Sequence, residues 1–274
     1  MILYSHRLDD DNPGDKYSSP LHYFDMGSYK TVDIAKPKNA TPEQVPVNNY
    51  SLNIVGGGDI FASVKWTKWN IDIAEQAQAK HNIIWGAGIL FRKPDLVDLL
   101  DRYSLIGTRV YQESYSRNIT FVPCASCMHE LFDQEYEITK EVGLIRHFKR
   151  EIPYIPGPTK FGLDEHSKIR NKPQTMEDVI TFIGSHETII TNSYHAAYWA
   201  QLLNRRVICY VPNDNPDDKL LTFEHNPIVY GDNEFSLDLV KQEYNYENLL
   251  VRYRERNRVF YERVVNEYLD SDMS

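Results

Sequence analysis

Short apolar segments alternate with amphipathic segments along most of the chain. Apolar runs bounded by Gly, Pro or polar residues predict strands at residues 1–5, 51–55, 82–85, 103–107, 119–122, 144–148, 188–191 and 206–211. Helical spacing of apolar residues predicts helices at residues 18–26, 71–80, 94–101, 176–184, 193–203 and 237–268. Strands that alternate with helices in this way are typical of an α/β fold with parallel sheets.

A change in composition near residues 132–140 suggests that the chain forms two domains. With 274 residues, the chain is long enough for two hydrophobic cores. We expect a Rossmann-like domain at residues 1–135 and a smaller Rossmann-like domain at residues 136–274, which includes the long terminal helix. Residues 30–50 are rich in Pro, Lys and Asn and are expected to form an irregular surface segment.

Charge and targeting signals narrow the class of protein. The formal net charge of −9 argues against binding to nucleic acid, because the overall field repels phosphates. The N-terminus lacks the basic and apolar regions of a signal peptide, and no apolar run reaches the roughly 18 residues of a membrane span. Three cysteines are few and odd in number, which fits a reducing compartment. We therefore expect a cytoplasmic protein.

Candidate ligand-binding residues follow the predicted strands. Ligands of open α/β sheets bind beyond the carboxyl ends of the strands, so residues at these positions form one candidate group. The group comprises Asn12, Gly14, Asp15, Gly56, Gly57, Gly58, Asp59, Gly86, Gly88, Arg109, Asn192, Ser193 and His195.

The glycine run at residues 56–58 has two interpretations. Glycine adopts positive φ easily and lets a ligand approach the backbone closely, but the same residues also form tight strand-to-helix turns. The run is not the GxGxxG dinucleotide fingerprint, and the chain has no Walker lysine pattern. We therefore set aside nicotinamide-dependent functions and nucleoside-triphosphate hydrolysis.

The segment from Asn192 to His195 joins a predicted strand to a predicted helix. Asn192 or Ser193 can cap this helix, and His195 then lies in the first turn, where free N–H groups and the helix dipole attract a phosphate or carboxylate. A histidine here can transfer a proton near neutral pH, or it can simply pack against the fold. Arg109 can bind an anion through two hydrogen bonds or form a surface salt bridge.

The pattern of cysteines and histidines does not predict a metal site. Cys124 and Cys127 form a CxxC pair without a second pair, which is insufficient for a structural zinc site. His147, His186 and His225 are scattered along the chain and lack ligand spacing.

Five segments together resemble the polysaccharide pyruvyl transferase family, whose members add pyruvate ketals to bacterial surface sugars. The segments occur in the family's order, from about residue 10 to about residue 212. Val110 departs from the pattern, because the family usually has an aspartate after this arginine. The segments are Asn12-Pro13-Gly14-Asp15, Asn53-Ile54-Val55-Gly56-Gly57-Gly58-Asp59, Ile84-Trp85-Gly86-Ala87-Gly88, Gly107-Thr108-Arg109 and Ile190-Thr191-Asn192-Ser193-Tyr194-His195-Ala196-Ala197.

The resemblance implies a fold and a reaction. The two domains would be arranged as in GT-B glycosyltransferases, with the acceptor on the first, the donor on the second and a cleft between them. The reaction would transfer pyruvate from phosphoenolpyruvate to two hydroxyls of a sugar, in a surface polysaccharide or its lipid-linked precursor. Phosphoenolpyruvate is a substrate here, and no cofactor or metal is implied.

The resemblance also implies roles for individual residues. His195 would be the general acid or would hold the phosphate, and Ser193 would complete the anion site. Arg109 would bind the anionic groups of the donor. Asn12 and Asp15 would hold the acceptor sugar or act as the base, and the glycine turn would let the acceptor lie against the backbone.

Two other functions and one other partner remain open. The same fold suits a glycosyltransferase that uses a nucleotide-activated sugar, and it suits a non-catalytic glycan-binding protein. The terminal helix places arginines beside apolar residues, which fits packing on the core or contact with the inner membrane surface. The sequence does not indicate an oligomeric state. The arginines are Arg252, Arg254, Arg256, Arg258 and Arg263.

Overall fold

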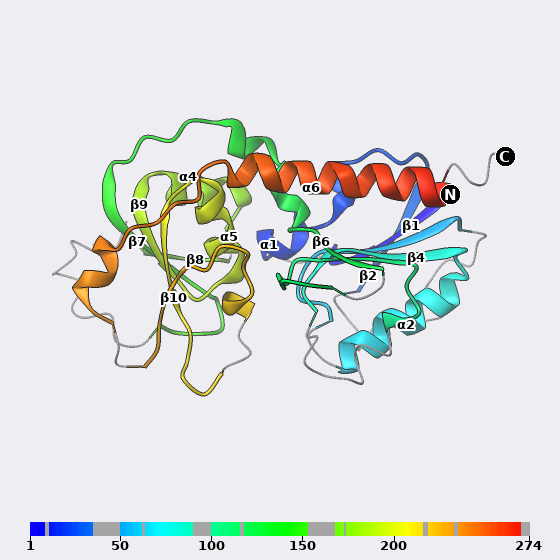
Figure 1. Ribbon diagram of the computed structural model, residues 1–274, viewed down its shortest axis with the longest axis horizontal. Coiled ribbons are helices and arrows are strands. Elements are labelled where there is room, and N and C mark those ends of the chain that lie inside the picture. The colour runs from blue at the N-terminus through cyan, green and yellow to red at the C-terminus, as the bar shows by residue number, and fades with distance from the viewer. Residues whose placement is uncertain are drawn as a thin grey trace. The chain divides into compact units, whose positions relative to one another are not determined.

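The computed structural model shows two compact units, which we describe separately (Figure 1). It describes residues 1–8, 11–34, 50–61, 64–89, 100–115, 118–152, 168–172, 174–215, 219–232 and 235–269. Unit 1 comprises Met1–Asp10, Asp15–Met128 and Tyr253–Ser274, and unit 2 comprises Asp11–Gly14 and His129–Arg252.

Unit 1 contains a six-stranded sheet in which every neighbouring pair of strands is parallel. Since all strands run in the same direction, their carboxyl ends lie at one edge of the sheet. Across the sheet, the strands are β2 (Tyr29–Asp33), β1 (Ile2–His6), β3 (Leu52–Gly56), β4 (His81–Ala87), β5 (Leu105–Thr108) and β6 (Ile119–Phe121).

Both faces of this sheet are buried, as its nearly continuous apolar strands require. Successive residues of β1 point to opposite faces. Leu3 belongs to a core cluster that includes Ile71, whereas Tyr4 belongs to a cluster on the other face that includes Phe260. The helices that provide Ile71 and Phe260 are α2 (Val64–Ala77) and α6 (Leu249–Val264).

A buried asparagine attaches the later part of α6 to unit 1. Asn257 is 0% exposed; its Oδ1 accepts a hydrogen bond from Trp85 Nε1 at 2.9 Å, and its Nδ2 donates to the Pro123 carbonyl at 3.2 Å. A buried amide needs such partners, so these bonds hold the helix in place. We expected the whole terminal helix to belong to the domain at residues 136–274, but Tyr253–Ser274 belongs to unit 1. These contacts join residues far apart in the chain, and a periodic pattern does not show them.

Unit 2 contains a five-stranded sheet that is also parallel throughout. An α/β fold with two parallel sheets, as predicted, is therefore confirmed. Because β7 lies between β8 and β9, the loops that follow these three strands meet at one edge. Across the sheet, the strands are β11 (Ile228–Tyr230), β10 (Arg206–Tyr210), β9 (His186–Thr191), β7 (Lys140–Arg146) and β8 (Lys168–Arg170).

Two helices of unit 2 agree closely with the sequence prediction. Helix α4 (Met176–Gly184) begins with a capping box, in which Thr175 and Asp178 each accept a hydrogen bond from the other's backbone N–H. Helix α5 (Tyr194–Leu202) follows β9, and every one of its residues is buried. A helix that is buried on all sides is held firmly by the surrounding core, which gives its first turn a defined position.

Other predicted elements differ from the structure. Strand β2 was expected to be irregular; it is an edge strand in which only Val32 is buried, so its sequence lacks a clear apolar pattern. The expected terminal helix at residues 237–268 is divided, and the expected helix at residues 94–101 lies almost entirely outside the described residues. The helix expected at residues 18–26 is only a short 3-10 turn. The short elements are α1 (Pro13–Lys16), η1 (Pro20–His22), η3 (Ala125–Met128), η4 (Glu130–Asp133), η7 (Lys219–Leu221), η8 (Leu237–Lys241) and η9 (Val265–Leu269).

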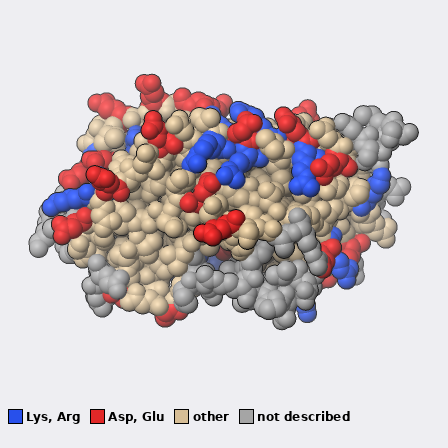
Figure 2. Space-filling model, in the orientation of Figure 1, with Lys and Arg blue, Asp and Glu red and all other residues tan. Residues whose placement is uncertain are grey.

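Figure 2 shows Lys and Arg gathered over α6, with Asp and Glu among them. Several of these arginines have partners within the chain. Arg254 donates to the Cys127 carbonyl, Arg256 lies over the Phe121 ring, and Arg263 pairs with Glu267. These contacts favour packing on the core as the role of the basic residues. No helix in the described ranges combines the length and apolar character needed to cross a membrane.

Candidate functional site

In unit 1, predicted site residues meet at the carboxyl ends of β3, β4 and β5. Arg109 is 2% exposed, and its Nη2 lies 4.0 Å from Oδ1 of Asp59. A Cβ atom on Gly88 would lie 2.6 Å from that Oδ1 and 3.3 Å from Arg109 Nε. Gly88 therefore leaves the space in which the guanidinium and the carboxylate lie together. Since Arg109 is buried beside a carboxylate, it is not the surface salt bridge that the sequence left open.

The loop after β1 adds a second charged pair to the same edge. Arg7 donates a hydrogen bond to the Asp15 carboxylate and forms an ion pair with it. A Cβ atom on Gly58 would lie 3.4 Å from Oδ1 of Asp15. The structure thus brings Asp15, Gly58, Asp59, Gly88 and Arg109 to one edge of the sheet, as the sequence predicted.

The three other glycines of unit 1 that were predicted to lie in the site, Gly56, Gly57 and Gly86, serve chain packing. Gly57 has φ +68°, and a Cβ atom there would collide with Ser18. A Cβ atom on Gly56 would lie 2.5 Å from the ring of Pro20. The chain itself therefore fills the space that was expected to admit a substrate. Gly86 has φ +63° and lies within β4, where the register against β5 shifts and a Cβ atom would lie 3.1 Å from the Pro123 carbonyl.

In unit 2, the segment after β9 connects the strand to α5 as predicted. Thr191 Oγ1 accepts a hydrogen bond from the Ser193 backbone N–H at 3.0 Å, which shapes the turn. Ser193 is the N-cap residue, but its side chain makes no capping hydrogen bond. Asn192 does not cap the helix either; its side chain bonds the loop after β7. Neither Ser193 nor Asn192 thus caps α5 with its side chain, and the N–H groups of the first turn form the positive end of the helix dipole.

His195 lies in this first turn and is almost completely enclosed. It is 7% exposed, and its ring lies 5.5 Å from the ring of Trp199. The Cα of Gly14 approaches it so closely that a Cβ atom on Gly14 would lie 2.8 Å from Cβ of His195. Gly14 therefore provides the space for the histidine, which explains why the two residues belong to one site.

Two further asparagines complete this part of unit 2. Asn171, which follows β8, has its Nδ2 3.5 Å from Oδ1 of Asn12 and 3.5 Å from Oγ of Ser193. Its Oδ1 accepts a hydrogen bond from the Phe148 N–H at 2.8 Å. The structure thus brings Asn12, Gly14, Asn192, Ser193 and His195 together within unit 2, and Asn171 joins them.

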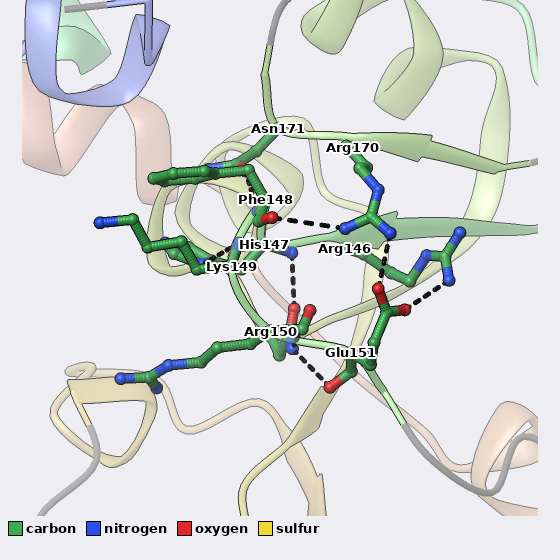
Figure 3. A network of polar contacts seen from close by, with 9 residues as sticks. Arg146, His147, Phe148, Lys149, Arg150, Glu151, Arg170 and Asn171 are labelled. Atoms are coloured by element: carbon green, nitrogen blue, oxygen red, sulfur yellow. Dashed lines mark hydrogen bonds and ion pairs between the residues drawn. The ribbon is translucent and has the colours of Figure 1, made fainter.

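The loop after β7 carries a group of cations that the sequence analysis did not single out (Figure 3). Asn192 fixes this loop: Oδ1 accepts from the His147 N–H at 2.7 Å, and Nδ2 donates to the carbonyls of Arg150 and Glu151. Figure 3 shows that Lys149 and Arg150 extend away from Glu151. Arg146 and Arg170 instead contact the Glu151 carboxylate, each at 2.6 Å.

The pKa of His147 is lowered by its burial and by the cations that surround it. Burial and the neighbouring cations, of which Lys219 and Arg150 act most strongly, lower the pKa of His147 to about 4. Its Nδ1 accepts the Lys149 N–H at 3.2 Å, so the proton of the neutral ring is on Nε2. Lys149 and Lys172 both lie over the Phe148 ring, at 5.1 Å and 4.1 Å. The edge of unit 2 is therefore suited to an anion.

The predicted strand bounds hid this basic loop. The predicted strand at residues 144–148 runs through it, whereas β7 ends at Arg146 and leaves the next residues free to form a loop. His147 was not predicted as a site residue because it has no metal-ligand spacing in the sequence. Its backbone partner Asn192 lies in another loop, the one after β9. Among the described residues, no cluster of three His, Cys, Asp or Glu side chains could hold a metal ion.

Comparisons with known proteins give a family and a fold. The family model described as polysaccharide pyruvyl transferase matches residues 1–215. No curated protein matches the chain. A functionally uncharacterised protein from Klebsiella pneumoniae has a similar structure, with a TM-score of 0.53 and 13% identity over 84% of this chain and 92% of that one. At this identity, the similarity concerns the fold alone.

Two solved transferases show weaker similarity. The wall teichoic acid polymerase TagF (H444N variant) has a TM-score of 0.41 and 12% identity over 96% of this chain and 83% of that one. Escherichia coli ADP-heptose lipopolysaccharide heptosyltransferase II has a TM-score of 0.34 and 11% identity over 94% of this chain and 98% of that one. We base no argument on these two similarities.

Proposed function

The chain belongs to the polysaccharide pyruvyl transferase family, and from this we propose that it transfers pyruvate from phosphoenolpyruvate to a sugar. The acceptor is a surface polysaccharide or its lipid-linked precursor, and the product is a cyclic ketal. The observation that carries the proposal is the edge of unit 2, where the first turn of α5, His195 and a basic loop lie together.

The donor's two anionic groups match this edge. Phosphate and carboxylate accept hydrogen bonds from backbone N–H groups at a helix N-terminus and are attracted by lysine and arginine. Lys149 and Arg150 extend from a loop that Asn192 and Asn171 hold in place, so the positive charge is positioned before a ligand arrives. We assign the donor anion to these groups before Arg109, because Arg109 is buried beside Asp59 in unit 1.

The reaction requires a proton on the methylene carbon of phosphoenolpyruvate and the departure of phosphate. A general acid protonates the methylene carbon of phosphoenolpyruvate, and the resulting cationic centre is attacked by a sugar hydroxyl, which loses its proton to a base. A second hydroxyl of the same sugar then displaces phosphate and closes the ketal. We assign the acid to His195, the orientation of the acceptor to Asn12 and Asp15, and acceptance of the hydroxyl proton to the carboxylate of Asp15.

The direct test is release of phosphate from phosphoenolpyruvate in the presence of sugar acceptors. We expect release only when a nitrophenyl glycoside or lipid-linked sugar of the galactose, mannose or hexosamine type is present, together with one pyruvate bound per phosphate released. Absence of release with every acceptor, combined with no thermal stabilisation by phosphoenolpyruvate, would reject the proposal. Stabilisation by nucleotide sugars alone would support the glycosyltransferase alternative.

Titration of His147 provides a test of donor binding that needs no acceptor. A bound anion stabilises the imidazolium, so phosphoenolpyruvate should raise the pKa of His147 above its value of about 4. Binding should then take up a proton and become tighter as pH falls through the raised pKa, levelling off below about pH 4. Ring resonances of labelled histidine, assigned with His147→Gln, measure the shift. Unchanged resonances at saturating phosphoenolpyruvate would place the donor elsewhere.

A further inference from the structure

Unit 1 contains a hollow that the proposed reaction does not use. It has a volume of about 370 Å³ and is lined by the segment from Leu21 to Gly27, by Tyr4 and by Tyr29. Tyr29 is the first residue of β2 and pairs with Ile2, at the amino end of these strands. Tyr29 therefore marks the amino end of the sheet, whereas the candidate site follows the carboxyl ends.

Aromatic rings form fixed walls of this hollow. Tyr4 is 1% exposed and meets Tyr29 edge to face, with ring centroids 5.7 Å apart. Phe24 stacks on Tyr261 at 5.0 Å and contacts Trp85 at 5.1 Å. Tyr29 is 53% exposed, although its neighbour Tyr4 is buried in the core. An exposed aromatic ring on a rigid support offers a flat apolar surface at little cost in conformational entropy.

A carboxylate is fixed at the same place. Oδ1 of Asp25 accepts a hydrogen bond from the Gly27 N–H at 2.9 Å, and Gly27 has φ +89°, which favours glycine. A Cβ atom on Gly27 would have no neighbour within 4 Å, so the space beside this turn is open. A carboxylate has several acceptor sites, and one backbone bond leaves capacity for a hydroxyl donor.

We propose that this hollow binds a neutral hexose unit of a glycan. The ring of a hexose has an apolar face of C–H groups, which packs on Tyr29, and a rim of hydroxyls, which donate to Asp25. The volume lies near the lower end of small-ligand pockets, roughly 300–1,000 Å³. Among the described residues, the lining contains no lysine or arginine, which disfavours a phosphate or another anion.

The choice of a sugar over a cation rests on the proposed function, which supplies a glycan acceptor. The hexose unit bound here is a different unit from the sugar that reacts, so it would anchor a long acceptor and leave a single sugar unaffected.

Binding of neutral oligosaccharides tests the proposal with purified full-length chain. The probes are galactose-, mannose- and N-acetylhexosamine-containing oligomers, with choline as the cation probe, followed by saturation-transfer NMR. We expect an oligosaccharide to bind the wild type, and Tyr29→Ala to weaken this binding at least about tenfold, the effect of losing roughly 1.4 kcal/mol. Asp25→Asn, which keeps the bond to Gly27, should weaken it less. Tyr111→Ala is the matched control, because Tyr111 is 37% exposed and lies outside the hollow.

The outcomes separate this proposal from the proposed function. If no oligosaccharide binds, if only choline binds, or if Tyr29→Ala binds as the wild type does, the hexose proposal is wrong even where phosphate release is observed. If binding depends on Tyr29 but phosphoenolpyruvate yields no phosphate, the hollow binds glycan and the proposed reaction fails. Where both hold, Tyr29→Ala should raise KM for oligosaccharide acceptors and leave turnover of a monosaccharide acceptor unchanged.

Discussion

Replacing His195 with alanine should reduce phosphate release from phosphoenolpyruvate by about 100- to 10,000-fold, the range that a general acid contributes. The residue lies in the first turn of α5, enclosed by Trp199 and Gly14. The measurement is the initial rate with an acceptor sugar that supports turnover in the wild type.

Two controls distinguish a catalytic effect from a structural one. His225→Ala removes a histidine of the same unit that bonds Arg252 outside the site, and it should keep wild-type activity. Thermal unfolding should show that His195→Ala remains folded. Wild-type turnover in His195→Ala would exclude the residue from the chemistry, and equal losses in both variants would indicate a general effect on the fold.

Adding one methyl group at Gly14 should cause a loss of activity close to that of His195→Ala. The new Cβ atom would lie 2.8 Å from Cβ of His195, and it would lie even closer to the ring. Rotation of the imidazole moves the ring but leaves the Cβ contact, so the histidine or the loop must shift. Overpacking of this kind costs about 1–3 kcal/mol of unfolding free energy. Phosphate release and thermal unfolding of Gly14→Ala measure the two effects.

A double variant tests whether the clash with His195 is the cause. In a His195→Gly background, the methyl group at residue 14 meets neither an imidazole ring nor a Cβ atom at residue 195, so Gly14→Ala should lose most of its destabilising effect there. Additive losses of stability in the double variant would show that Gly14 acts through the backbone and does not act through the histidine. Unimpaired turnover in the single variant would show that the position of His195 is not critical.

The sequence predicted the layout of the fold because its signals are local. Apolar residues that recur every second position, or every three to four, follow from the geometry of one strand or one helix. This is why most strands of both parallel sheets and the helices α4 and α5 were placed correctly, whereas the three-residue strands β8 and β11 were not predicted. Strand β2 was missed because an edge strand needs few apolar residues, and its sequence Tyr-Lys-Thr-Val-Asp contains few of them.

Part of the candidate site could be predicted for the same reason. Residues at the carboxyl ends of parallel strands meet at one edge, so Asp15, Asp59 and Arg109 in unit 1 could be grouped from the chain alone. In unit 2, Asn12, Gly14 and His195 were grouped by their resemblance to one family. Which glycine faces a substrate was not predictable, because Ser18 and Pro20 fill the space at Gly57 and Gly56.

His195 illustrates the division between sequence and structure. By itself, the sequence determined that a strand passes into a helix at Thr191–Tyr194 and that a histidine lies in the first turn. Only the tertiary structure decided that Asn192 holds the His147 loop, 45 residues away, and that Asn171 lies beside Ser193. The strand order places β7 between β8 and β9, so three loops meet beside α5. Strand order depends on the packing of the whole unit, and no local pattern in the chain records it.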